Sequence, residues 1–223
     1  MSTSVFGPPV FKRHSLLKRS VSHTREHFSR YYEQHHGPLA SSLRGFRKFS
    51  ERYIQNHVED LPEGGEPLFD GVTMTTQVPR EDYTRGFFNE PDYEKVKPDE
   101  IYLFDLSKTV SVLGREELII DGPPTPHKAL ILTHMGMLAA MKMPPPSRLV
   151  LNHLDRATAS ALGFSAGSFD YDLLAEVWFE DAEVRAQAFQ SVKVFNRDQP
   201  SQAVFLPVRE VLIFGPEKPW RDG

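Results

Sequence analysis

The sequence of 223 residues contains no cysteine, which excludes a disulfide framework, a thiolate metal site and a cysteine nucleophile. Its longest apolar stretches fall far short of the ~20 residues that a membrane-spanning helix requires. The N-terminus has no basic segment followed by an apolar run, so we expect no secretory signal and a cytoplasmic protein. The formal net charge of −4 argues against nucleic acid or a membrane surface as a general partner.

Motifs for common cofactors are also missing. We find no phosphate-binding glycine loop and no dinucleotide-binding fingerprint. His35 and His36 are adjacent, so their side chains would diverge on a helix instead of meeting at one metal ion. We therefore expect no cofactor and no metal, and chemistry that depends on side chains alone.

What the sequence does contain is a repeat. The stretch Arg52-Tyr53-Ile54-Gln55-Asn56-His57-Val58-Glu59 returns as Arg148-Leu149-Val150-Leu151-Asn152-His153-Leu154-Asp155, an offset of 96 (148 − 52). Three further matches follow the same order along the chain: Lys12 with Lys128, Asp70 with Asp172, and Arg115-Glu116 with Arg209-Glu210. A duplication of the whole chain explains all four matches.

Each copy reads as strand–helix–strand–strand–helix–strand, the ferredoxin-like (βαββαβ) order. Copy one is predicted over 8–121, with strands at 10–19, 52–59, 69–78 and 109–120 and helices at 22–39 and 79–88. Gly37-Pro38 is expected to end or bend the first of these helices. Residues 122–126 are the predicted linker. Copy two is predicted over 127–216, with strands at 127–135, 148–155, 171–179 and 208–213 and a helix at 181–195. Its first helix is predicted to be shortened, because 20 residues are missing between its first two strands (116 − 96).

These residues also carry a family resemblance. The segments Glu26-His27-Phe28, Tyr31-Tyr32 and His35-His36-Gly37-Pro38-Leu39, followed by the strand from Tyr53 to His57, resemble an EthD-type domain of the dimeric α+β barrel superfamily. Asp172, Glu176 and Trp178 resemble the acidic third strand of that family, whereas copy one has Met74 and Thr76 in place of the glutamate and tryptophan. The resemblance implies an α+β fold in which two ferredoxin-like units form a barrel within one chain. Whether this pseudo-dimer pairs again as a homodimer is left open.

The candidate catalytic residues are His57, His36 and Glu176. Apolar Ile54 and Val58 are expected to lie under the helices, which would point His57, and His153 by the same alternation, into the barrel. Imidazole titrates near neutrality and suits proton transfer. Glu176 is expected to have a raised pKa beside Trp178. Structural roles stay open for each: a backbone hydrogen bond for His57, helix capping for His36, and an ion pair with Arg148 for Glu176.

The candidate substrate-binding residues are Tyr32, Tyr53, Gln55, His153, Asp172, Trp178 and His134. A phenol hydroxyl can donate a hydrogen bond to a ketone, a phenol or a carboxylate, although tyrosines are often only core residues. The resemblance extends to decarboxylases and cyclases of fungal polyketide pathways. It therefore implies a cofactor-independent lyase or cyclase acting on a hydrophobic aromatic substrate of secondary metabolism. The alternatives are a cofactor-free oxygenase of an electron-rich phenol, and a non-catalytic carrier or accessory protein.

Overall fold

The computed structural model describes residues 10–77, 86–160 and 169–218. The strands of this part of the chain are β1 (Phe11–Leu17), β2 (Ser50–Val58), β3 (Gly71–Gln77), β4 (Val110–Ile120), β5 (His127–Thr133), β6 (Arg148–Asp155), β7 (Leu173–Phe179) and β8 (Val204–Phe214). The α-helices are α1 (Arg25–Tyr31), α2 (Gly37–Ser42), α3 (Arg44–Phe49), α4 (Lys97–Leu103), α5 (Arg156–Ser160) and α6 (Ala182–Asp198). Shorter helical turns are η1 (Tyr32–His36), η2 (Gly86–Asn89), η3 (Pro91–Lys95) and η4 (Leu138–Met141).

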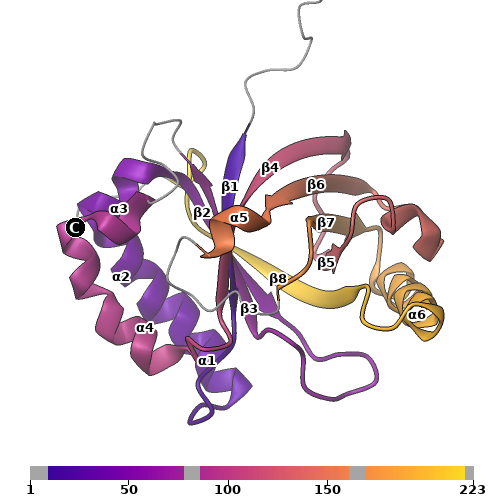
Figure 1. The fold of residues 1–223 in the computed structure, drawn as a ribbon, viewed down its shortest axis with the longest axis horizontal. Helices are drawn as coiled ribbons and strands as arrows, with labels where there is room; N and C mark the ends of the chain where they lie inside the picture. The colour runs from indigo at the N-terminus through magenta and orange to yellow at the C-terminus, as the bar shows by residue number, and fades with distance from the viewer. Residues whose placement is uncertain (1–9, 78–85, 161–168, 219–223) are drawn as a thin grey trace, which may run out of the picture.

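The strands close into one barrel in the order β1-β3-β2-β8-β5-β7-β6-β4, and every neighbouring pair is antiparallel. The first four strands lie in the order β4-β1-β3-β2, and the last four repeat that order as β8-β5-β7-β6. We call residues 10–120 the first half and residues 127–218 the second half. Helices α1 to α4 cover the barrel on one side and α6 covers the opposite side (Figure 1). The predicted mixed fold around a barrel is confirmed.

The interior of the barrel holds an aliphatic cluster together with a group of buried charged side chains. One apolar cluster takes side chains from every strand: Leu16, Val58, Val72, Val112, Leu130, Leu154, Leu174 and Val208, in the order β1 to β8. Because side chains alternate across a strand, the neighbours of these residues point outward, toward the helices. The part of the interior that this cluster fills is therefore a packed core and not the substrate pocket that was expected inside the barrel.

The predicted orientation of the second strand is wrong. Ile54 and Val58 pack in the interior cluster, whereas His57 faces outward beneath α1. The sequence indicates that the two faces of this strand differ, but both faces are buried. The alternation of side chains along β2 therefore does not indicate which of its faces lies under the helices, because apolar side chains pack equally well against the helices and in the barrel core.

The first half carries a nearly continuous helical layer. Thr24 caps α1, and its hydroxyl accepts a hydrogen bond from the backbone N–H of His27 (3.1 Å). The helix does not end at Gly37-Pro38: the chain stays helical from Arg25 to Ser42, with the π-helical turn η1 immediately before Gly37. Pro38 lies in the first turn of α2, where a missing N–H is tolerated.

The other helical predictions differ in outcome: the one over 79–88 lies mostly outside the described residues, whereas those of the second half agree with the structure. The helix expected over 79–88 falls mainly on residues outside the described part of the chain, and residues 86–89 form the 3₁₀ turn η2. In the second half, β5 is joined to β6 through the single turn η4, whereas α1, α2 and α3 stand between β1 and β2. Asp181 caps α6, which packs on the barrel through Ala188 and Val192. No described helix is long and apolar enough to cross a membrane.

Candidate functional site

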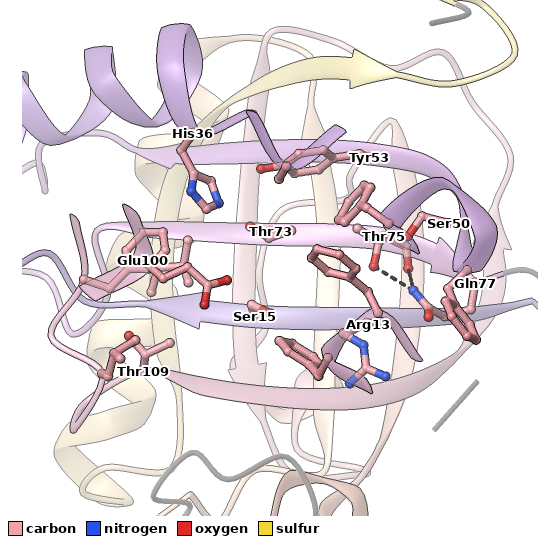
Figure 2. Close-up of a pocket in the computed structure, with 18 residues that line it drawn as sticks. Arg13, Ser15, His36, Ser50, Tyr53, Thr73, Thr75, Gln77, Glu100 and Thr109 are labelled. Atoms are coloured by element: carbon pink, nitrogen blue, oxygen red, sulfur yellow. Dashed lines mark hydrogen bonds between the residues drawn. The ribbon is translucent and has the colours of Figure 1, made fainter. Parts of the chain in front are cut away.

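A cavity lies in the first half, between the outward face of the barrel and the helical layer (Figure 2). Its lining includes outward side chains of β1, β2 and β3, side chains of η1 to α4, and aromatic rings. The lining residues are Arg13, Ser15, Leu17, His36, Ala40, Phe46, Phe49, Ser50, Tyr53, Thr73, Thr75, Gln77, Phe87, Phe88, Glu100, Phe104, Leu106 and Thr109. The lining is therefore mixed: aromatic and aliphatic side chains provide apolar surface, and ten of the eighteen residues carry polar or charged groups that can orient a small ligand.

The size of the cavity limits what it can hold. Its volume is about 70 Å³, about half of the 150 Å³ in which an apolar protein cavity holds benzene. A single aromatic ring would fit only if some lining side chains moved outward. The site thus suits a small ring, and a substrate of several fused rings would have to reach out of its mouth.

The clearest catalytic pair in the cavity is His36 with Asp99. The ring Nδ1 of His36 lies 2.6 Å from Oδ2 of Asp99 in α4, and both side chains are buried. Since a carboxylate only accepts, Nδ1–H is the donor, and the neutral ring then carries its lone pair on Nε2. Nε2 makes no hydrogen bond with the described residues, so it is available to a bound molecule.

Asp99 is held in its charged form. Burial opposes its ionisation, but the hydrogen bonds from His36 and from the hydroxyl of Tyr31 (2.8 Å) favour the carboxylate, and the pKa of Asp99 is lowered. An ionised Asp99 fixes the ring orientation of His36 and stabilises the imidazolium that forms when Nε2 takes a proton. This arrangement is that of a general base.

A second carboxyl group lies close by, and its pKa is shifted in the opposite direction. Burial raises the pKa of Glu100, and the hydroxyl of Tyr93 donates a hydrogen bond to its Oε2 (2.6 Å). A carboxyl group with a raised pKa can hold a proton and donate it to a ligand. Asp99 and Glu100, consecutive in α4, therefore differ in protonation tendency, which is how acid and base roles are separated in a site.

Tyr53 and His57 are linked by Gln55. The amide Nε2 of Gln55 donates to the hydroxyl oxygen of Tyr53 (2.8 Å) and to the carbonyl of Tyr32 (2.7 Å), which leaves its Oε1 to accept from Nε2 of His57 (3.2 Å). Nδ1 of His57 then accepts from the hydroxyl of Ser29 (2.8 Å). Because the oxygen of Tyr53 accepts this bond, its own proton is left to donate to a neighbouring hydroxyl or to a molecule in the cavity, which Tyr53 lines.

His57 itself does not line the cavity. Burial lowers the pKa of His57 to about 4, so the ring is neutral at physiological pH. Tyr32 is also fully buried, and its hydroxyl pairs with the hydroxyl of Thr73 (2.5 Å), a lining residue. Of the predicted residues of copy one, His36 and Tyr53 line the cavity, while Gln55, His57 and Tyr32 form the layer behind it.

The far end of the cavity from His36 is polar (Figure 2). Burial lowers the pKa of Arg13 to about 10, and its guanidinium carbon lies 5.2 Å from the centre of the Phe88 ring. Gln77 donates to the hydroxyl of Thr75 (2.7 Å). A ligand in the cavity would therefore lie between a base at one end and a cation at the other.

Glu176 lies elsewhere, inside the barrel. Its carboxylate is 2.7 Å from the ammonium groups of both Lys12 and Lys128, and Asn152 donates to it (3.1 Å). Burial opposes ionisation, but the two lysine charges hold the pKa of Glu176 well below its usual range. The prediction that the pKa of Glu176 is raised is wrong, because the carboxylate contacts two lysines. These lysines come from other strands, so the sequence of β7 alone does not indicate them. The partner of Glu176 is not Arg148, which pairs with Asp121 (2.9 Å).

The other second-half candidates do not gather at the cavity either. Trp178 packs beneath the ammonium of Lys128, 4.4 Å from the ring centre. His153 lies on the outer face and pairs with Glu117 (2.6 Å), and Asp172 accepts the backbone N–H of Met135 (2.7 Å). His134 stacks beside Tyr171 with ring centres 5.8 Å apart. None of the four lines the cavity.

Sequence reasoning missed Asp99 and Glu100. Both lie 63 or more residues beyond His36 (99 − 36) in a stretch with no repeat partner, so only the fold brings them near. Two other patterns need mention. His23 and His27 have metal-ligand spacing, with ring centres 4.7 Å apart, but no group of three candidate ligands exists among the described residues. Residues 163–167 read Gly-x-Ser-x-Gly and lie outside the described part.

Comparison with known proteins identifies one domain. Residues 22–107 match the EthD domain family, which confirms the recognition made from the sequence motifs. No curated protein sequence matches this chain. Among solved structures, a chain titled "putative monooxygenase" from Lactobacillus acidophilus NCFM is similar at 8% identity and a TM-score of 0.42, over 92% of this chain and 95% of that one. The EthD match spans η1, α4 and therefore both members of the His36–Asp99 pair.

Proposed function

We propose that the EthD domain of this chain forms an active site in the first-half cavity and catalyses proton transfer on a small aromatic ketone or phenol. The reaction class we favour is that of a cofactor-independent lyase or cyclase. The single observation that carries this proposal is the His36–Asp99 hydrogen bond of 2.6 Å, which leaves Nε2 of His36 free at the cavity wall.

Each group has a role in this scheme. Nε2 of His36 removes a proton from a carbon beside a carbonyl, or from a phenol, and Asp99 stabilises the resulting imidazolium. The hydroxyl of Tyr53 and the carboxyl of Glu100 donate hydrogen bonds to the oxygen on which negative charge develops. The imidazolium then returns the proton to the leaving group or to a ring carbon. Aldol-type cyclisation and dehydration begin with removal of a proton from carbon. In decarboxylation the carbon–carbon bond breaks as CO₂ leaves, and the acid then delivers a proton to the carbanion.

We also propose that the two halves correspond to two ferredoxin-like units, 8–121 and 127–216, joined by 122–126. The repeated strand order β4-β1-β3-β2 and β8-β5-β7-β6 supports this division. The cavity that holds His36 is lined by residues of the first unit. The second unit then serves to close the barrel, and a hydrophobic aromatic molecule is the expected partner of the first.

Proton transfer can be tested without the natural substrate. The probe is 2′-hydroxyacetophenone in D₂O, and ¹H NMR follows loss of its methyl signal as deuterium replaces hydrogen. We expect the wild type to accelerate this exchange, and His36→Gln to reduce the acceleration by about 10²–10⁴-fold. Asp99→Asn should also reduce it, because an amide cannot stabilise the imidazolium.

The matched control is His134→Gln, a histidine change in the second half away from the cavity. It should leave the exchange rate unchanged. Full activity of His36→Gln in a folded protein would refute the proposal. Probe binding without exchange in the wild type would favour the carrier alternative. Oxygen consumption with formation of a quinone would favour the oxygenase.

A further inference from the structure

A second hollow lies on the outside of the barrel in the second half. Its volume is about 390 Å³, and its walls come from β6, β7 and the segment that contains η4. The lining residues are Met135, Gly136, Leu138, Ala139, Lys142, Met143, Pro144, Pro146, Leu149, Leu151, Leu173 and Val177. We call this hollow the second-half groove. Its volume falls in the range of about 300–1,000 Å³ that is usual for small-molecule sites.

The groove occupies the face of the second half that corresponds to the cavity face of the first. With the repeat offset of 96, Tyr53 and Gln55 correspond to Leu149 and Leu151, and with the third-strand offset of 102, Thr75 corresponds to Val177. These three polar side chains of the first half are thus replaced by aliphatic ones. The groove keeps a binding shape without acid or base groups, which suits binding without catalysis.

Lys142 is the one lining residue with a polar or charged side chain. It caps η4 in the left-handed conformation, with φ of 50°, which is uncommon for residues other than glycine. Its ammonium group forms no hydrogen bond or ion pair with the described residues. The groove therefore combines an apolar trough with an unpaired cation at its rim.

We propose that the second-half groove binds a monomeric straight-chain carboxylate such as a fatty acid, with the carboxylate at Lys142. The lining contains no aromatic ring, so a flexible chain is favoured over a flat molecule. Met135 and Met143 can adapt to such a chain, because the unbranched thioether has three rotatable bonds. The ammonium group of Lys142 would attract the carboxylate of the fatty acid, and the apolar trough would bury its methylene groups.

The test is isothermal titration calorimetry of the full chain with octanoate, decanoate and dodecanoate, each below its critical micelle concentration. Affinity should rise by up to about four-fold per added methylene until the trough is filled. Decanol, which has the same tail without the charge, should bind about two- to five-fold more weakly than decanoate. That difference should disappear in Lys142→Gln.

Two variants place a carboxylate in the groove. Leu151→Glu changes the floor, and Ala139→Glu changes an exposed rim position at which misfolding is not expected. Both should weaken decanoate binding at least ten-fold, while Tyr53→Phe in the other half should leave it unchanged. Affinity that is independent of chain length, or unaltered in Ala139→Glu, would overturn the proposal. So would equal binding to phosphatidylcholine vesicles free of fatty acid.

Discussion

The carboxylate of Glu176 provides the sharpest test of how the barrel interior is stabilised. The side chain is 3% exposed and lies between Lys12 and Lys128, whose side chains are 13% and 1% exposed. Glu176→Gln removes the charge and leaves two buried ammonium groups with only their outer partners, Glu116 and Glu210. Removing one member of a buried ion pair typically costs about 3–5 kcal/mol of the free energy of unfolding.

We expect that loss for Glu176→Gln in urea unfolding followed by circular dichroism and by tryptophan fluorescence. Trp178 reports directly, because its ring lies against Lys128. In a chain of this length the same loss lowers the melting temperature by about 6–20 °C. Lys128→Met alone should also destabilise, but the double variant should lose clearly less than the sum, since the remaining Lys12 keeps Glu116 as its partner.

The dependence on pH supplies the internal control. The folded-state pKa of Glu176 lies below its unfolded value, so its stabilisation is present above the unfolded pKa and is lost as pH falls through the folded pKa. The difference in unfolding free energy between wild type and Glu176→Gln should therefore be largest near neutral pH and shrink in acid. A loss below about 1 kcal/mol at pH 7, or additive single variants, would refute the reasoning.

Three further predictions concern the first half. Gly37→Ala should cost about 1–3 kcal/mol in urea unfolding and slow the NMR-detected exchange, because its Cβ would lie 2.8 Å from Nε2 of Gln55; full stability would contradict this packing. Thr24→Ala should cost about 1 kcal/mol by loss of the α1 cap, whereas Thr24→Ser should keep most of it. In the unfolded chain His57 has a pKa of about 6.5, whereas burial lowers the pKa of the folded ring to about 4. Between these values the unfolded state binds a proton that the folded state does not. Acid should therefore destabilise the wild type more than His57→Gln between those pH values, as pH-dependent urea midpoints would reveal.

The sequence was most informative where the chain repeats. The matched Asn-His strands and the alternation of short strands predicted the duplication and most strand positions, because period-two patterning and turn residues are local signals. The barrel was expected only from the resemblance to the EthD family. The orientation of β2 was not predictable, since both of its faces are buried. Of the proposed site, His36 and Tyr53 came from the motif, but Asp99 and Glu100 depend on the packing of α4 against η1. Such contacts between distant segments leave no pattern in a single sequence.

The single acid Glu176 in the barrel shows what joining two halves in one chain permits. Glu176 on β7 stands opposite Leu130 on β5, while the corresponding position on β3, Met74, stands opposite His14 on β1. If two identical chains built the barrel, any residue placed near its axis would appear twice. One acid would bring a second acid at the equivalent position, and that buried carboxylate would need cationic partners of its own. Because the two halves are joined in one chain, their sequences can differ. A single acid such as Glu176 can then be buried in the barrel without a symmetry-related copy.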